Sequence, residues 1–437
     1  MINKIFAFIQ SKTEYLYENS LILKNIDLLI LLSLSAVYVL SVFVQSDLIG
    51  LFAILTFALT LIKLLTRTNE KIECNNFELF LLAYFMIAIV SLAGSSLFMS
   101  SLKGFSKIFI YLAFYISVVS YLKNNKDKIW WLIFLIAGCA LFEVFHGFIQ
   151  TFIRPEAIST WQDTTYLNPE QIINRVYGTL KPLNPNLFGG YLVAVIPALF
   201  GVMAYFVGKN LTLFSASFLA SILSCYILFQ TGCRGAYLGL FAIVIFLFTV
   251  SYKFFEDKYK KIYLYVCGII SLIGFLFVMS VTSLRARIFS IFAMRTDSSN
   301  SFRFNVYHSC LHMFQDNWLL GVGLGNSNFR EIYGLYMKTG FDALSAYNIY
   351  LETAVESGIF ALIAYLGFLI LLINSAYKYI NSTKYTTDVL AVTIALASII
   401  GLMVHGFVDT VFFRPQIQFI FWTMVAVIRV QTDNIAD

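Results

Sequence analysis

A single arginine, Arg234, stands between two long apolar stretches, in the sequence TGCRGA at residues 231–236. It is the only Asp, Glu, Lys or Arg between residues 210 and 252, and the glycines beside it permit a tight turn and a close backbone approach. An arginine in this setting either anchors a helix end at the membrane interface or binds an anion. We favour the anion, because the planar guanidinium can grip a phosphate or carboxylate with two hydrogen bonds.

A second arginine leads a segment with helical periodicity, SSNSFRFNVYHSCLHMF at residues 298–314. Apolar side chains recur every four residues, and the Ser and Asn residues at its start can cap a helix. Arg303 and Tyr307 then share one face, and a helix start together with an arginine is a favourable anion site. His308 and His312 share a roughly opposite face, but catalytic zinc needs three protein ligands, so we expect no metal there.

A third segment, LSAYNIYLETAVESG at residues 344–358, places polar groups at the start of a long apolar run. Asn348, Glu352 and Glu356 recur every four residues, so they share one face of a helix. Because lipid is a poor environment for such groups, we expect this face to point into the protein. We also expect its two acids to pair there with the two arginines already described.

The segment HGFVDTVFFRP, residues 405–415, closes another apolar run. His405 and Asp409 are four residues apart and can pair on a helix, while Arg414 follows at the same membrane surface. This pair either closes the helix or supplies a catalytic histidine, and the sequence leaves both alternatives open. The glycine-rich GVGLGN at residues 321–326 follows no predicted strand, so it indicates a turn rather than a nucleotide site.

Long uncharged stretches must position all of these residues. The chain has 437 residues, of which 59% are hydrophobic and 12% charged, against about 25% charged in a typical soluble domain. Stretches of about 18 or more residues without charge can cross a bilayer as helices. We therefore predict an all-α polytopic membrane bundle of about 12 helices, in a range of about 10 to 12. The predicted spans are 27–46, 48–65, 78–98, 105–122, 129–150, 187–207, 211–230, 235–252, 262–281, 353–376, 388–408 and 413–430.

Two connections are long, at residues 151–186 and 282–352, and we expect the second to be partly helical. With these loops outside, the short connections carry 17 Lys and Arg inside and 4 outside, the bias that cytoplasmic segments show. The sequence thus predicts an integral inner-membrane protein with both termini in the cytoplasm. Residues 1–26 form a cytoplasmic segment, 27–430 the transmembrane domain and 431–437 a cytoplasmic tail.

Arginine and lysine are distributed differently in this topology. Nine of the 11 Arg lie outside, whereas 15 of the 19 Lys lie inside. Since either residue satisfies the charge rule for orientation, the outer arginines indicate an anion site, formed by Arg234, Arg303, Arg287 and Arg414. The net charge of +6 is too dispersed to indicate nucleic acid, and the six cysteines lack metal-ligand spacing, so we expect neither a metal nor a cofactor.

The order of these segments resembles the O-antigen ligase and polymerase superfamily of membrane glycan transferases, over roughly residues 180–410. The shared features are the turn at Arg234, a large outer loop with Arg303 and Tyr307 on a helix, the glycine-rich turn and the Asn-led start of the next span. The resemblance implies that the arginines bind the diphosphate of a polyprenyl-linked glycan. It also implies a histidine before the Asn that activates the acceptor hydroxyl, but this chain has Tyr347 in that place.

A narrower resemblance covers most of the chain. The stretches NPNLFGGYLV, RARIFSIF, DSSNSFRFNV and HGFVDTVFFRP are similar to those of the IctB-like cyanobacterial membrane proteins. These proteins are named as bicarbonate transporters and linked to the accumulation of inorganic carbon. The narrower resemblance thus implies a different substrate from the broader one.

Two functions therefore compete, and our first hypothesis is bicarbonate transport or accumulation, on the narrower resemblance. The alternative is a glycosyltransferase of the ligase or polymerase type at the outer membrane face, whose arginines would stabilise a polyprenyl diphosphate leaving group. Tyrosine ionises near pH 10, so Tyr347 cannot replace a histidine base near neutral pH, and Glu352 or His405 would have to do so. The residues expected to support the site in either case are Asn348, Glu356, Asp409 and Tyr307.

Overall fold

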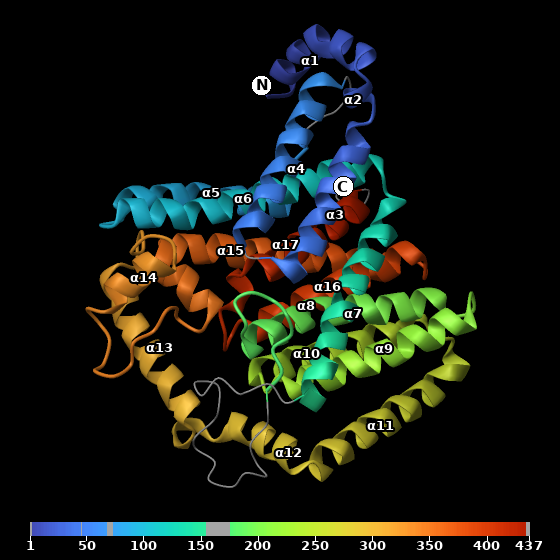
Figure 1. Cartoon of the computed structure of the whole chain (residues 1–437), viewed down its shortest axis with the longest axis vertical. Helices are drawn as coiled ribbons and strands as arrows, with labels where there is room; N and C mark the ends of the chain where they lie inside the picture. Colours follow the sequence, from blue (N-terminus) through green and yellow to red (C-terminus); the bar gives the residue numbers. More distant parts are fainter. Residues whose placement is uncertain (1, 45, 68–72, 154–174, 434–437) are drawn as a thin grey trace.

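The computed structural model describes residues 2–44, 46–67, 73–153 and 175–433, and all regular elements among these residues are helices. Eleven of them are long and apolar enough to cross a membrane (Figure 1). This confirms the predicted all-α polytopic bundle and falls within the predicted range of spans. In chain order they are α3 (Ile26–Phe43), α4 (Ser46–Thr66), α5 (Asn76–Gly94), α6 (Phe98–Asn124), α7 (Lys128–Ile153), α8 (Pro185–Phe206), α9 (Leu211–Gln230), α10 (Arg234–Phe254), α11 (Asp257–Ser280), α15 (Ile349–Ser382) and α16 (Thr387–His405).

The last predicted span, 413–430, corresponds to α17 (Pro415–Thr432), which is not among the eleven. It packs against α6 and α16, and nearly all of its residues are buried. Arg429 lies in this buried helix, and its Nε is 2.9 Å from Glu78 Oε2 of α5. A buried charge of this kind requires a partner, and here the pair ties α17 to α5.

α8 and α16 form the centre of the bundle, since 78% and 72% of their most apolar stretches are buried. α10 packs closely against α16, because a Cβ on Gly239 would lie only 2.9 Å from the Gly401 carbonyl oxygen. His405, the last residue of α16, lies next to Gly190 of α8 and Gly235 of α10. The first turns of α8 and α10 and the end of α16 therefore meet at one end of the bundle.

Two parts of the chain lie at the edge of the bundle. The helix α1 (Ile2–Asn19) and the short helix α2 (Leu21–Lys24) precede α3, and the Gln10 amide of α1 donates to the Leu64 carbonyl of α4 (2.8 Å). α11 has no buried residue, and Figure 1 shows it standing apart from the other long helices. Its contact with α10 is near its start, where the Tyr263 hydroxyl donates to the Phe248 carbonyl (2.8 Å), and the apolar remainder is suited to contact with lipid.

The connection between α11 and α15 is largely helical, as predicted. It contains α12 (Thr282–Phe289), the short 3-10 helices η3 (Ser290–Phe292) and η4 (Met294–Thr296), α13 (Ser298–Asp316) and α14 (Asn326–Tyr333). α13 extends slightly beyond the predicted helix, and its cap is not one of the predicted Ser or Asn residues. Asp297 caps it instead, since its Oδ1 accepts the backbone N–H of Asn300 (2.8 Å). A small core of its own, including Val306, Cys310 and Tyr333, holds this region together.

The glycine-rich turn at residues 321–326 returns the loop to α15. Gly321, Gly323 and Gly325 have positive φ angles of 72°, 102° and 99°, which other residues adopt only with strain. The backbone N–H groups of Val322 and Gly323 donate to the carbonyls of Val355 and Glu356 (2.9 and 3.0 Å). The sequence predicts a turn here, and the turn fastens the loop to the first turns of α15.

Candidate functional site

Four arginines from four separate segments converge on a cavity of about 130 Å³, called here the arginine cavity. They are Arg175 before α8, Arg234 at the start of α10, Arg287 in α12 and Arg303 in α13. No motif marks Arg175 in the sequence; only its place among the loop arginines points to it. Its Nε donates to the Thr231 carbonyl (2.7 Å), and burial together with nearby Arg287 lowers the pKa of Arg175 to about 10. It still carries its charge at neutral pH.

Arg234 is held in a buried ion pair with the Asp297 cap of α13. Its Nη1 lies 2.9 Å from Asp297 Oδ1 and also donates to the hydroxyl of Ser290 (3.0 Å). Arg234 is 8% exposed and Asp297 3%, and in the described part of the chain Arg234 Nη2 has no hydrogen-bond partner. The sequence could have indicated Asp297, because Asp before Ser-Ser-Asn is a strong N-cap.

This cap changes the expected anion site at the start of α13. The N-terminal N–H groups of a helix favour an anion, but Asp297 already provides one. Its carboxylate also fixes Arg234 relative to α13. The helix start therefore positions an arginine and leaves the binding of an external anion to the guanidinium groups.

Arg303 connects the arginine cavity with Asp409. Its Nη1 donates to the Ser299 hydroxyl (2.8 Å), its Nη2 lies 3.8 Å from Asp409 Oδ2, and its guanidinium lies 5.6 Å from the centre of the Tyr347 ring. The Nε of Arg303 is buried without a hydrogen-bond partner among the described residues. Arg287 is fixed separately, by donation from its Nε to the Gly232 carbonyl (3.0 Å).

The arginine cavity has an excess of positive charge. The described residues that line it include four arginines and no acid. Asp297 and Asp409, each in an ion pair with one arginine, offset two of the four charges. Four guanidinium groups thus share a confined space, where electrostatic interactions are stronger than in water. The cavity is complementary to an anion.

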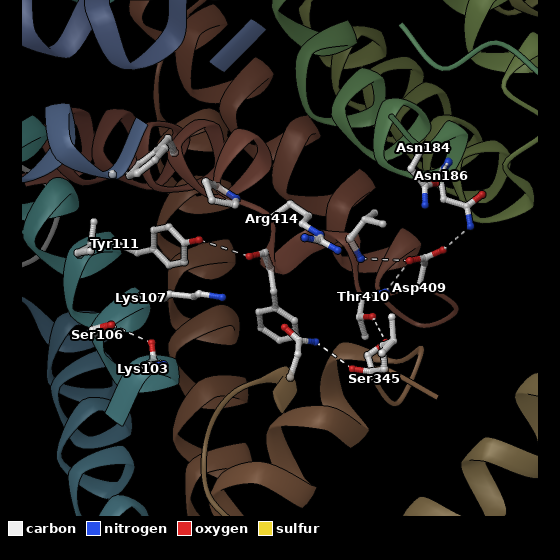
Figure 2. A pocket seen from close by; sticks show the side chains of 18 of the residues that line it. Lys103, Ser106, Lys107, Tyr111, Asn184, Asn186, Ser345, Asp409, Thr410 and Arg414 are labelled. Atoms are coloured by element: carbon white, nitrogen blue, oxygen red, sulfur yellow. Dashed lines mark hydrogen bonds between the residues drawn. The ribbon is translucent and has the colours of Figure 1, made fainter. Parts of the chain in front are cut away.

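A second cavity of about 770 Å³, called here the large cavity, adjoins the first (Figure 2). Asn186, at the start of α8, lines both cavities. Its Nδ2 donates to Asp409 Oδ2 (3.2 Å), while Asp409 Oδ1 accepts the N–H groups of Thr410 and Val411 (2.7 and 3.1 Å). Arg414 lines the large cavity and not the arginine cavity, so the structure separates it from Arg234, Arg287 and Arg303.

Tyr347 also lines the large cavity, in an unusual backbone conformation with φ +50°. Burial raises the pKa of Tyr347, and the nearby Asp409 carboxylate adds to the rise. Its carbonyl accepts a hydrogen bond from the Tyr307 hydroxyl (3.1 Å), whose own pKa burial raises to about 12. The shift at Tyr347 strengthens the prediction that its hydroxyl cannot replace a histidine as base.

The two glutamates of α15 do not pair with the arginines, contrary to expectation. Glu352 accepts the backbone N–H of Ala346 (3.0 Å), and Glu356 accepts that of Gly325 (2.9 Å). Both carboxylates thus hold the loop that precedes α15, and neither residue lines the arginine cavity. Asn348 caps α15 with its Oδ1, and its Nδ2 donates to the Phe407 carbonyl (3.0 Å).

His405 and Asp409 do not lie on one helix, because α16 ends at His405. His405 is fully buried, its Nε2 lies 3.6 Å from Cys233 Sγ, and it lines neither cavity. Cys233, His405 and Asp409 are the one group of three possible metal ligands among the described residues, with ligand atoms within 4.8 Å. Arg303 beside Asp409 disfavours a further cation, so we assign no metal.

The rings of His308 and His312 lie 4.5 Å apart on α13. No third ligand joins them within the described ranges. They stand away from the cavities described above, since neither residue lines them. The expectation of no zinc site at this pair stays a prediction.

An apolar groove of about 640 Å³ runs between α10 and α16. Leu238 lines both this groove and the arginine cavity, so the two spaces meet at that residue. Phe407 and Val408, consecutive in the chain, likewise contribute to the groove and the cavity respectively. The described residues that line the groove are Leu238, Phe241, Ala242, Ile245, Phe246, Thr249, Ile400, Val404 and Phe407.

Comparison with known proteins gives two findings. The O-antigen ligase family model matches residues 219–366, which include Arg234, Arg303 and Tyr347. The teichuronic acid biosynthesis protein TuaE of Bacillus subtilis (strain 168) is 26% identical over 350 residues, which cover 77% of this chain and 68% of that protein. Neither finding concerns the IctB-like proteins. Together with the eleven apolar helices, they identify the chain as an integral membrane protein that is similar to the O-antigen ligases.

Proposed function

We propose that the protein transfers a glycan from a polyprenyl diphosphate carrier to a second substrate, at the outer face of the membrane. The observation that carries the proposal is the junction of the arginine cavity with the apolar groove at Leu238. A polyprenyl diphosphate has a highly charged head joined to a long apolar chain. The two adjoining spaces match these two parts, and the similarity to O-antigen ligases supports the same substrate class.

In this proposal the diphosphate occupies the arginine cavity, and the polyprenyl chain lies along α10 and α16. The four guanidinium groups favour the highly charged head, and each of them can bind two phosphate oxygens at once. Arg234 Nη2 and Arg303 Nε, which lack hydrogen-bond partners among the described residues, are donors available to it. As the glycan departs, the same donors stabilise the charge that develops on the diphosphate.

The acceptor enters the large cavity and meets the donor near Asn186. Its hydroxyl oxygen attacks the anomeric carbon of the glycan, the bond from that carbon to the diphosphate oxygen breaks, and the hydroxyl proton goes to Asp409. Asp409 is the only acid among the described residues that line either cavity. Arg303 and Asn186 orient its Oδ2. Asp409 thus takes the role that the sequence offers to Glu352 or His405.

Bicarbonate transport receives no support from either comparison. Bicarbonate is small and has no apolar part, whereas the arginine cavity is lined by four arginines and shares Leu238 with an apolar groove. A polyprenyl diphosphate therefore accounts for both the arginine cavity and the apolar groove, whereas bicarbonate accounts for the positive charge alone.

The test is reconstitution of the protein in vesicles with a polyprenyl-diphosphate-linked glycan. We expect turnover of the carrier and no bicarbonate flux. Arg303→Lys keeps the charge but loses the paired donors, so turnover should fall at least about tenfold. Arg330→Lys is the matched control, because Arg330 pairs with Asp342 (2.6 Å) at an exposed position and lines neither cavity. Bicarbonate flux by the native protein without carrier turnover would overturn the proposal.

A further inference from the structure

Three cations line the large cavity away from the arginine cavity. Lys103 and Lys107 lie four residues apart on α6 and so share one face of that helix, and Arg414 precedes α17. Figure 2 shows Lys107 extending from α6 toward the side of the cavity where Arg414 lies. No carboxylate forms an ion pair with any of the three within the described ranges. The mechanism above uses none of them.

The balance of charge in this cavity is positive. Among the described residues that line it, the three cations stand against one acid, Asp409, whose oxygens already interact with Arg303, Asn186 and two backbone N–H groups. Like charges gathered around one cavity repel each other, and an anion that enters the cavity relieves this repulsion. The lining therefore selects for negative charge in the second substrate.

The other polar groups of the lining are of the kind that bind sugars. Asn184, Asn326, Ser345 and Thr410 offer amide and hydroxyl groups, and the aromatic ring of Tyr111 lines the same cavity. The volume of about 770 Å³ lies within the range of cavities that hold ligands of several rings, about 300–1,000 Å³. These groups suit hydroxyl-rich rings, while the three cations suit acidic substituents on them.

We propose that the glycan which enters the large cavity is acidic, and that Lys103, Lys107 and Arg414 bind its carboxylate or phosphate groups. This proposal rests on the proposed function, because it names the class of the second substrate. Lysine carries a compact charge on a flexible side chain, whereas arginine presents a rigid, planar set of donors. Two lysines one helical turn apart can therefore bind acidic groups at different spacings. The cations set the preference for the substrate, and the transfer step stays with the groups near Asn186.

A phospholipid head group is the competing source of negative charge, since α6 is a membrane helix. Two features favour the glycan. The third cation comes from a separate segment on another side of the cavity, and the cavity is lined by amides and hydroxyls as well as by apolar residues. A lipid head group at the rim of α6 alone would need neither feature.

The test measures binding rather than transfer, on the full-length protein in nanodiscs of zwitterionic lipid. The probes are a soluble oligosaccharide that contains uronic acids and the same oligosaccharide with its carboxyl groups reduced to alcohols. We expect the acidic form to bind on the order of tenfold more tightly, and this preference to shrink as salt rises, because exposed ion pairs are screened. Lys103→Gln with Lys107→Gln should abolish the preference, and Arg414→Gln should reduce it. Lys338→Gln is the control, at an exposed loop position outside the cavity.

Each other result has a definite meaning. Equal binding of the acidic and reduced forms, or an unchanged preference in the double variant, would overturn the proposal. Loss of the preference in nanodiscs that contain anionic phospholipid, with competition by soluble glycerol phosphate, would assign the cations to lipid and also overturn it. Binding of a polyprenyl diphosphate is measured in parallel. If that binding fails while the acidic preference persists, the proposed transfer function fails and the preference for acidic glycans stands.

Discussion

Asp409→Asn tests the assignment of the base, because asparagine has nearly the same shape but accepts no proton. In the structure, Asp409 Oδ1 accepts the N–H groups of Thr410 and Val411, and an asparagine oxygen can keep both bonds. The change therefore removes the charge and the basic oxygen near Arg303 while the local backbone keeps its hydrogen bonds.

The magnitude follows from two separate contributions. General-base catalysis contributes about 10²–10⁴-fold to a rate, so kcat should fall by that factor. The Arg303–Asp409 contact is long, at 3.8 Å, and Arg303 is 19% exposed, so its loss should change the stability by only about 1 kcal/mol. Carrier binding should change little or become tighter, because Arg303 is released from its carboxylate.

The assay is single-turnover transfer from the polyprenyl diphosphate carrier, with carrier binding measured separately. Asp342→Asn is the control, since it removes a carboxylate from an exposed ion pair that lines neither cavity. A kcat within about threefold of the native value, in a protein that folds and binds carrier normally, would refute the assignment of Asp409 as base.

Three further predictions concern the parts that hold the site. Asp297→Ala leaves the buried Arg234 without its carboxylate partner and α13 without its cap, so the free energy of unfolding, measured by thermal unfolding in detergent, should fall by about 3–5 kcal/mol. For the control Asp342→Ala it should fall by about 1 kcal/mol or less. Tyr347→Phe should leave kcat within about threefold of the native value. The dependence of kcat on pH from 6 to 9 should also stay unchanged, because the raised pKa of Tyr347 keeps its hydroxyl protonated in that range. A new or lost inflection in this pH profile would contradict the prediction. Gly323→Ala should reduce the yield of folded protein, since it adds a Cβ at φ +102° against Ser95 and Ser101. Gly340→Ala is the control, because open space surrounds it and only the strain of the positive φ angle remains. Normal folding of Gly323→Ala would contradict the role of the turn.

Much of the fold could be predicted because the length of an uncharged, apolar stretch can be measured directly along the sequence. The spans, the helix of the long loop and the glycine-rich turn follow from charge-free stretches, a four-residue repeat and closely spaced glycines. The last predicted span, which corresponds to α17, includes Arg429, whose partner Glu78 is distant in the sequence. That pairing is a tertiary contact, so the sequence of the helix alone cannot predict it.

The candidate site was predicted less completely, because its arrangement depends on contacts between residues that are distant in the sequence. Arg234 and Arg303 stand out locally, but Asp297 and Asp409, rather than Glu352 and Glu356, are their partners. Local spacing places both glutamates on the face of α15 that points inward, yet it cannot show that a folded-back loop supplies backbone N–H groups to them. Arg175 enters the cavity from a segment with no motif, so only the three-dimensional arrangement reveals it.

Locating the polyprenyl chain tests the proposed function most directly. A polyprenyl diphosphate with a photoreactive group on its chain is bound to the protein, crosslinked, and the labelled residues are identified by mass spectrometry. If the polyprenyl chain lies in the apolar groove, adducts should form at residues such as Phe241 and Ile245 of α10 and Ile400 of α16, and Arg303→Lys should markedly reduce them. Labelling confined to other surfaces such as α11, or groove labelling that Arg303→Lys leaves unchanged, would contradict the proposed function.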